Sequence, residues 1–358
     1  MKTLPLAPTH IARQTGLSLV ELMVAVTLSL LLTVGVIQIF MSSKQTYSVQ
    51  DALSRLQENA RFALDFLTYD MRMAGYLGCD AGININSQVN NLPVVGAGFE
   101  AYDDYADLGA QVSLYTGTHA LANSDVVAGT DVLMVKGASS AGADLIEDMA
   151  DATSASAIVV NRAMADGLFQ NGELVMVSDC LDAEIFAVTS VTEVNADAEN
   201  SIPASINIGH AELLKPYSTA AGAQLMPLNY ALYYVGTDTQ QQPNLYREVL
   251  SVNETGQVIA VTEPLVRGVE DFQITYGERL DALGNNLRYV DPTASGFDPD
   301  RVVAIRFDLL MATEAANVAT DTQSYWLGDQ WTSAAADDRR LFRSFRHTIQ
   351  LRNKDIEL

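Results

Sequence analysis

The chain has 358 residues, with 44 acidic against 21 basic side chains and a formal net charge of −23. This charge argues against nucleic-acid binding, which needs a basic face, and against docking of the folded part on anionic lipid. The length suffices for one large domain or two small ones. Whether the acidic part binds Ca²⁺ stays open, since no loop matches the D-x-[DN]-x-[DN]-G spacing.

A long apolar segment runs from Gly16 to Met41, and Glu21 is its only charged residue. A helix that spans a bilayer needs about 20 apolar residues, so the segment is long enough. A carboxylate inside a membrane is costly unless a cation pairs with it, and a helix that only anchored the chain would not need Glu21. Lys2 and Arg13 precede the segment without any acid, which predicts a cytoplasmic N-terminus.

The glycine followed five residues later by a glutamate resembles the processing site of type IV prepilins. This resemblance implies that a membrane-embedded prepilin peptidase cuts after Gly16 and methylates the new N-terminus at Leu17. It also implies that Glu21 pairs with the N-terminal amine of a neighbouring subunit in the filament. In that family the residue after the cut is most often phenylalanine, whereas here it is Leu17.

The alternative interpretation of this segment is an ordinary secretory signal or signal anchor. The apolar run is longer than the core of a signal peptide, which has about 7–15 residues. The residues from Met41 to Lys44 are also a poor match to a small-x-small cleavage site.

A second helical pattern follows directly, because no proline lies between Pro8 and Pro93. Its apolar residues recur in steps of four and three, which predicts one buried stripe on a helix; they are Val49, Leu53, Leu56, Ala60, Ala63 and Leu67. Gly75 and Gly78 are the natural stop. The sequence therefore predicts one helix from Leu17 to Ala74, whose amphipathic half packs on the chain's own sheet. A coiled-coil seam is the alternative interpretation of the stripe, which is only about three heptads long.

The pattern after Gly78 is typical of a β-rich head. Residues 81–130 are expected to be mostly loop with short strands, residues 138–155 a mobile loop or a short helix, and residues 278–286 and 314–338 surface insertions. Alternating apolar and polar residues predict antiparallel strands at 131–136, 157–161, 173–178, 184–192, 230–235, 245–252, 257–262, 272–276, 288–290, 301–310 and 342–351.

The predicted fold class is α+β, with a long, pilin-like N-terminal stalk α-helix packed on a head dominated by antiparallel β-sheet. The expected parts are a prepilin leader peptide, the transmembrane half of the stalk helix, its amphipathic half and a periplasmic globular head, at residues 1–16, 17–41, 42–75 and 76–358. Two cysteines, Cys79 and Cys180, allow one disulfide bond outside the cytoplasm, and two free buried thiols are the alternative.

Four blocks of the chain resemble the PilW family of minor pilins: Leu56–Leu67 with Asp70–Cys79, Ser178–Cys180 with Ile185 and Phe186, Leu265–Gly277, and Arg340–Asn353. The resemblance implies a minor component of a type IV pilus that associates with other minor pilins and primes filament assembly. It places the subunit at or near the tip, beneath a large adhesin-like protein. Adhesion, twitching motility and DNA uptake depend on such a filament.

The further partners that the resemblance implies are the major pilin, the prepilin peptidase and an inner-membrane assembly platform. The implied location is the inner membrane, with one span and a periplasmic head, and then the cell-surface pilus. A minor pseudopilin of a type II secretion system is the alternative, because it shares the processing site and the β-rich head. The blocks around Cys79 and Cys180 favour PilW.

An anchored enzyme is a hypothesis of a different class, and the sequence argues against it. It has no G-x-S-x-G elbow, no H-E-x-x-H helix and no Walker A loop. The four histidines stand apart from acids and cysteines at ligand spacing; they are His10, His119, His210 and His347. No catalytic residue, cofactor or metal ligand is therefore expected. A third class is a binding head whose insertions contact a host surface or a tip adhesin.

Overall fold

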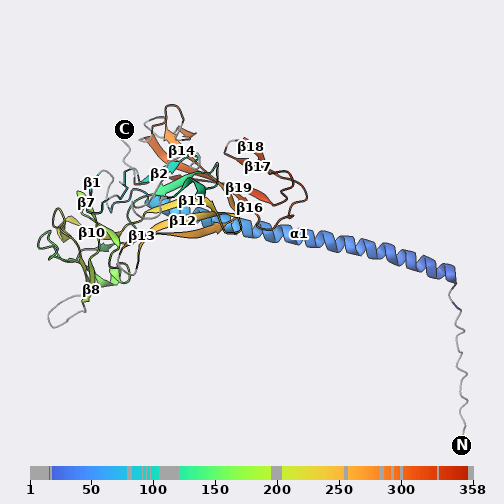
Figure 1. Cartoon of the computed structure of the whole chain (residues 1–358), viewed down its shortest axis with the longest axis horizontal. Coiled ribbons are helices and arrows are strands. Elements are labelled where there is room, and N and C mark those ends of the chain that lie inside the picture. Colours follow the sequence, from blue (N-terminus) through green and yellow to red (C-terminus); the bar gives the residue numbers. More distant parts are fainter. Residues whose placement is uncertain are drawn as a thin grey trace, which may run out of the picture. The chain divides into compact units, whose positions relative to one another are not determined.

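One long helix, α1, runs from Leu19 to Met73 and confirms the predicted N-terminal helix (Figure 1). The structure is a computed structural model. It describes the chain apart from residues 1–15, 17, 79–82, 91, 94, 97, 105–120, 195–203, 254–256, 282–285, 292–293, 299–300, 329 and 354–358. The chain forms two compact units, Met1–Asp51 and Ala52–Leu358, and α1 contributes to both.

The first part of α1, as far as Asp51, buries none of its large apolar side chains. Leu31, for example, is 70% exposed. In the described part of the chain, α1 is the one helix that is long and apolar enough to cross a membrane. A helix that is apolar on every side needs an apolar surrounding, and this one is compatible with a single membrane anchor.

The second part of α1 buries one face. The predicted stripe is confirmed at Leu56, Ala60, Ala63 and Leu67, which are buried against strands of the second unit. Full burial of one such leucine is worth about 1.5–3 kcal/mol, so this face holds the helix on the sheet. The helix ends before Gly75, whose φ of 70° is a left-handed conformation that glycine adopts without strain.

Two antiparallel sheets form the main core together with α1. The first has the strand order β13-β12-β11-β3-β2, with β2 at Phe99–Tyr102, β3 at Val132–Val135, β11 at Ala231–Thr237, β12 at Pro243–Val252 and β13 at Val258–Arg267. The second has the order β15-β14-β16-β19, with β14 at Val269–Arg279, β15 at Leu287–Val290, β16 at Val302–Ala312 and β19 at Phe342–Gln350.

Gly268 is the only residue between β13 and β14, and there the chain crosses from the first sheet to the second. Its φ is 74°, and a Cβ atom added to it would lie 2.6 Å from the carbonyl oxygen of Ala312. A side chain at this position would therefore strain the backbone and collide with β16.

A smaller group of strands packs beside these sheets. A five-stranded sheet has the order β1-β7-β6-β10-β4, in which β1 pairs with β7 in parallel; its strands are β1 at Asn84–Ser87, β4 at Ala143–Asp144, β6 at Leu174–Ser178, β7 at Asp182–Ala187 and β10 at Gln224–Pro227. A three-stranded sheet has the order β5-β9-β8, with β5 at Ile158–Asn161, β8 at Ser190–Val194 and β9 at Ser205–Gly209. Both sheets contribute to one buried cluster around Phe186 and Leu225.

The remaining elements are short. They are the helix α2, the 3₁₀ turns η2 and η3, and the separate two-stranded sheet β17-β18, at Arg162–Ala165, Asn123–Asp125, Thr219–Ala221, Ser324–Leu327 and Gln330–Ser333.

Three local predictions need correction. The strand expected at 184–192 is two strands, because the N–H of Val188 bonds to Glu173 in one sheet and that of Thr189 to Gly209 in the next. Residues 138–155 are neither a plain loop nor a helix, since they contain β4, which pairs with β10. The expected insertion at 314–338 contains the paired strands β17 and β18. The pairing of β4 with β10 joins residues distant in sequence, which local periodicity could not reveal, whereas β17 and β18 are neighbours in the chain and too short for a clear alternation.

Candidate functional site

The predicted assembly residue Glu21 stands in the first turn of α1. Its N–H donates to the hydroxyl of Ser18 at 3.2 Å, and the N–H of Ser18 donates to the Glu21 carboxylate at 3.4 Å. This reciprocal pair is a capping box, which satisfies two N–H groups that a helix start otherwise leaves free. Gly16 is exposed, with no atom within 4 Å of the place a Cβ would occupy. Leu17 lies outside the described residues, so cleavage and methylation stay predictions.

A buried polar clamp at the other end of α1 was missed by the sequence reasoning. Asp70 is only 2% exposed, and its carboxylate accepts hydrogen bonds from the hydroxyl of Tyr233, from Arg247 at 3.0 Å and from the amide of Asn229 at 3.4 Å. Tyr233 lies on β11 and Arg247 on β12, so the clamp joins the helix to two strands. The sequence did contain a sign of this buried carboxylate, because Asp70 follows Leu67 by three residues and so continues the apolar stripe of the helix.

The charges of the clamp support one another. Burial works to lower the pKa of Arg247, but Tyr233 and Asp70 beside the guanidinium raise it on balance. Burial and the Asp70 carboxylate raise the pKa of Tyr233. Both groups therefore keep their protons, and the buried carboxylate keeps its donors, as a buried charge requires.

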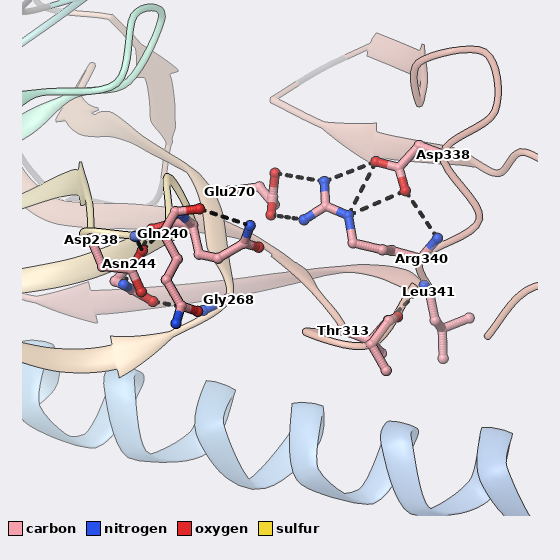
Figure 2. Close-up of polar contacts among 11 residues, drawn as sticks. Asp238, Gln240, Asn244, Gly268, Glu270, Thr313, Asp338, Arg340 and Leu341 are labelled. Atoms are coloured by element: carbon pink, nitrogen blue, oxygen red, sulfur yellow. Dashed lines mark hydrogen bonds and ion pairs between the residues drawn. The ribbon is translucent and has the colours of Figure 1, made fainter. Parts of the chain in front are cut away.

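A second polar cluster lies where β14, β16 and β19 begin or end (Figure 2). The guanidinium of Arg340 binds both carboxylate oxygens of Glu270 and both of Asp338, the latter at 2.8 to 3.2 Å. These bonds hold the pKa of Asp338 below its usual value. Beside the cluster, Thr313 and Leu341 exchange two hydrogen bonds, from the Thr313 N–H to the Leu341 carbonyl and from the Leu341 N–H to the Thr313 hydroxyl.

A polar pocket of about 320 Å³ opens next to Arg340. Its lining comes from the β11–β12 turn, the β13–β14 crossing and the end of β16, and it consists of Asp238, Gln240, Gln242, Pro243, Asn244, Arg267, Gly268, Glu270, Ala312, Thr313, Glu314 and Arg340. The Asp238 carboxylate fixes the turn by accepting the N–H groups of Gln240 and Gln242 at 2.8 and 2.9 Å. Amides and charges of both signs in this lining can bind a polar chain.

The carboxylates of Asp103, Asp104 and Asp131 form the one group among the described residues that could hold a metal ion, with oxygens within 4.8 Å of one another. Burial raises the pKa of Asp131 to about 8, although the N–H groups of Ile274 and Asp104 donate to it, and the charges of Asp103 and Asp271 add to the rise. Ca²⁺ takes about six to eight oxygens, so these residues supply part of a coordination shell. Sequence spacing gave no signal, because Asp131 is distant in the chain from the other two.

The predicted disulfide stays a prediction, because Cys79 lies outside the described residues. Cys180 is exposed, in the turn between β6 and β7, with a φ of 66°. Of the histidines, His210 is buried and its ring contacts the carbonyl oxygens of Ser156 and Ala211, which is a structural role. His347 is half-buried on β19.

Comparison with known protein families places part of the chain beside one of them. Residues 232–353 match the family PilW, described as Type IV Pilus-assembly protein W. Comparison with curated proteins and with solved structures returned no match. The matched region runs from β11 to just beyond β19 and covers less than half of the chain, which is similar to the PilW family there. That region contains Tyr233 and Arg247 of the clamp, the Arg340 cluster and the polar pocket, and pilus assembly is a structural rather than a catalytic task.

Proposed function

We propose that the protein is a minor pilin that primes assembly of a type IV pilus and is incorporated at or near its tip. The PilW match over residues 232–353 carries this proposal. It is supported by α1, because one continuous helix has an exposed, membrane-length apolar part and an amphipathic part that packs in the core of the matched region. A subunit that leaves a membrane to enter a filament needs both parts.

The N-terminal residues act in two steps in this proposal. Prepilin peptidase removes residues 1–16 by cutting after Gly16, and methylation then modifies the new N-terminus at Leu17. The carboxylate of Glu21 pairs with the N-terminal ammonium group of a neighbouring subunit as the helix enters the filament. The position of Glu21 supports this role, because its carboxylate is exposed in the first turn of the helix, where a neighbouring subunit's N-terminal ammonium can reach it.

The proposed organisation follows from the same features. Residues 17–41 span the inner membrane with the N-terminus in the cytoplasm, residues 42–75 form the amphipathic half of the helix, and residues 76–358 form the periplasmic head. Other minor pilins, the major pilin, a tip adhesin-like protein and the inner-membrane assembly platform are its partners. Adhesion, twitching motility and DNA uptake are the processes that the filament serves.

The N-terminal residue of the protein in native membranes tests the processing step. Mass spectrometry should find a mature chain that begins with N-methylated Leu17, and a Gly16→Trp variant should retain Met1. An intact Met1 in the natural protein, or a cut beyond Met41, would overturn the proposal. Deletion of the gene then separates a pilus from a secretion pseudopilus, since loss of surface pili with normal secretion is expected.

A further inference from the structure

The segment between β16 and β19 is an anchored arm. Its two ends are joined by the hydrogen bonds between Thr313 and Leu341 (Figure 2), and the N–H of Ala319 donates to the carbonyl of Arg339 at 2.8 Å. The ion pairs from Arg340 to Glu270 and Asp338 also hold the base of the arm, where it joins the sheet. The arm carries the β17–β18 pair, residues 324–333, called here the Trp ribbon. Its base is therefore fixed independently of any partner.

The inner face of the Trp ribbon packs on the second sheet. Tyr325 and Leu327 lie against a small buried cluster of Leu310, Ala312 and Phe342, and the rings of Tyr325 and Phe342 stack with centroids 5.2 Å apart. Side chains of β19 also reach the ribbon backbone, from Ser344 to the carbonyl of Trp326 and from Arg346 to that of Gly328. The ribbon is therefore held in place and presents a constant outer face.

The outer face carries both tryptophans of the chain. Trp326 and Trp331 are cross-strand partners, 40% and 69% exposed, with ring centroids 5.5 Å apart in an edge-to-face arrangement. The inner face supplies the contacts of the ribbon with the second sheet, whereas the two rings contact each other across the strands and leave much of their surface exposed. Tryptophan is among the residues most enriched at the energetic centres of protein interfaces, where it fills a pocket of the partner.

The segment that carries the two rings is acidic in sequence, and the arginines that contact the ribbon or its base, Arg346 and Arg340, are each paired with carboxylates. Residues 314–338 include five acidic residues and no lysine or arginine. Glu314 and Asp337 are exposed, and within the described part of the chain no ion pair involves either of them. A partner surface with basic residues around an apolar cleft complements this face, whereas a second copy of a chain with net charge −23, or an anionic bilayer, is repelled.

We propose that the outer face of the Trp ribbon docks Trp326 and Trp331 into an apolar cleft with a basic rim on a different protein. This proposal rests on the proposed function and deepens it. It names two side chains that contact another subunit and the kind of surface to which they bind. The two rings supply the buried centre of the interface and the acidic residues its polar rim.

Intrinsic fluorescence tests whether Trp326 and Trp331 are exposed to solvent, since the chain contains no tryptophan besides these two. In detergent, neutral acrylamide should quench the emission strongly. Cationic caesium should quench it more efficiently than anionic iodide at equal concentration, because the acidic rim attracts the cation. Protection from acrylamide, or a preference for iodide, would overturn the proposal.

Cross-linking in cells tests the partner. A photo-cross-linking amino acid at Ser333, on the exposed face beside the rings, should join the full chain to one protein, at a peptide with lysine or arginine flanking apolar residues. The yield should fall at least about tenfold in Trp331→Ala, as for an interface hot spot. The matched control Phe62→Ala, which removes a ring 48% exposed on α1, should leave the yield unchanged.

Cross-links to lipid, to a second copy of this chain or to no partner would overturn the proposal, and so would a yield that Trp331→Ala does not change. The N-terminus of the same protein is read by mass spectrometry in the same cells. A mature chain beginning at Leu17 without the cross-link contradicts only the ribbon, whereas an unprocessed chain contradicts the proposed function.

Discussion

Two carboxylates on one helix, Glu21 and Asp70, have opposite surroundings. Asp70 is buried and receives hydrogen bonds from Tyr233, Arg247 and Asn229. Glu21 is exposed, and its carboxylate and its N–H bond with Ser18 in the same turn. Near the C-terminal end of α1, the buried carboxylate thus has partners from distant parts of the chain. At the N-terminal end, the carboxylate has, among the described residues, a partner only in its own turn and is open to contact with other molecules.

The largest expected effect concerns the far end of α1, where Cys79 follows the helix. If Cys79 and Cys180 are bridged, replacing both with serine should lower the free energy of unfolding by about 4–5 kcal/mol, the value for a loop of about 100 residues in the chain-entropy model. Thiol labelling before and after reduction checks the bridge first. Equal labelling in both conditions would show two free cysteines, and the stability effect should then be absent.

Asp70→Ala should destabilise the head by about 3–5 kcal/mol, because it leaves the half-buried guanidinium of Arg247 without its nearest carboxylate, with only the exposed Glu263 still 3.9 Å away. Urea unfolding followed by circular dichroism measures the change. Asp65→Ala is the matched control, since its 3.7 Å pair with Arg61 lies on the exposed face of the same helix and is worth at most about 0.5 kcal/mol. Equal effects of the two variants would mean that the clamp does not hold the helix.

Leu67→Ala should cost about 2–5 kcal/mol, because it opens a cavity between α1 and the sheet. Leu31→Ala, in the part of α1 whose side chains are exposed, should leave the unfolding of the head unchanged. The same urea titration compares them, and a loss of stability in Leu31→Ala would contradict the division of the helix into two parts.

Asp131 predicts a pH dependence of stability. Its pKa is about 8 in the folded chain against 3.8 in the unfolded one, so folding favours the protonated carboxyl. The stability that this contributes is fully present below pH 3.8 and is lost as the pH rises to about 8, with a slope of at most about 1.4 kcal/mol per pH unit. Urea unfolding between pH 5 and 9 should show this fall. Burial also raises the pKa of Asp271 to about 6, so Asp131→Asn should flatten the part of the curve above about pH 6.

Glu21→Ala should have the smallest effect on stability and still impair assembly. The head should unfold as in the natural protein, because the variant removes only a cap at the N-terminal end of α1. Processing at Gly16 should continue, while the number of surface pili falls. Electron microscopy of pili together with N-terminal mass spectrometry checks both parts, and normal pilus numbers would count against an assembly role for Glu21.

Much of the fold and part of the site follow from the sequence alone. The lack of proline, the apolar run and the stripe at Leu56, Ala60, Ala63 and Leu67 determine α1, and alternation determines most strands of the main core, because both patterns depend on neighbours within a few residues. The prepilin-like residues Gly16 and Glu21 and the PilW-like blocks are likewise visible without a structure. They indicate pilus assembly but give no contacts.

Only the tertiary structure decides which groups meet. Asp70 and Arg247 are distant in sequence, as are Glu270 and Arg340, and their pairing depends on strand order and register. The same holds for the Trp ribbon, where cross-strand pairing turns Trp326 and Trp331 outward and Tyr325 inward. Local patterns reflect the periodicity of a helix or strand, whereas these contacts depend on how distant elements pack, which no local pattern encodes.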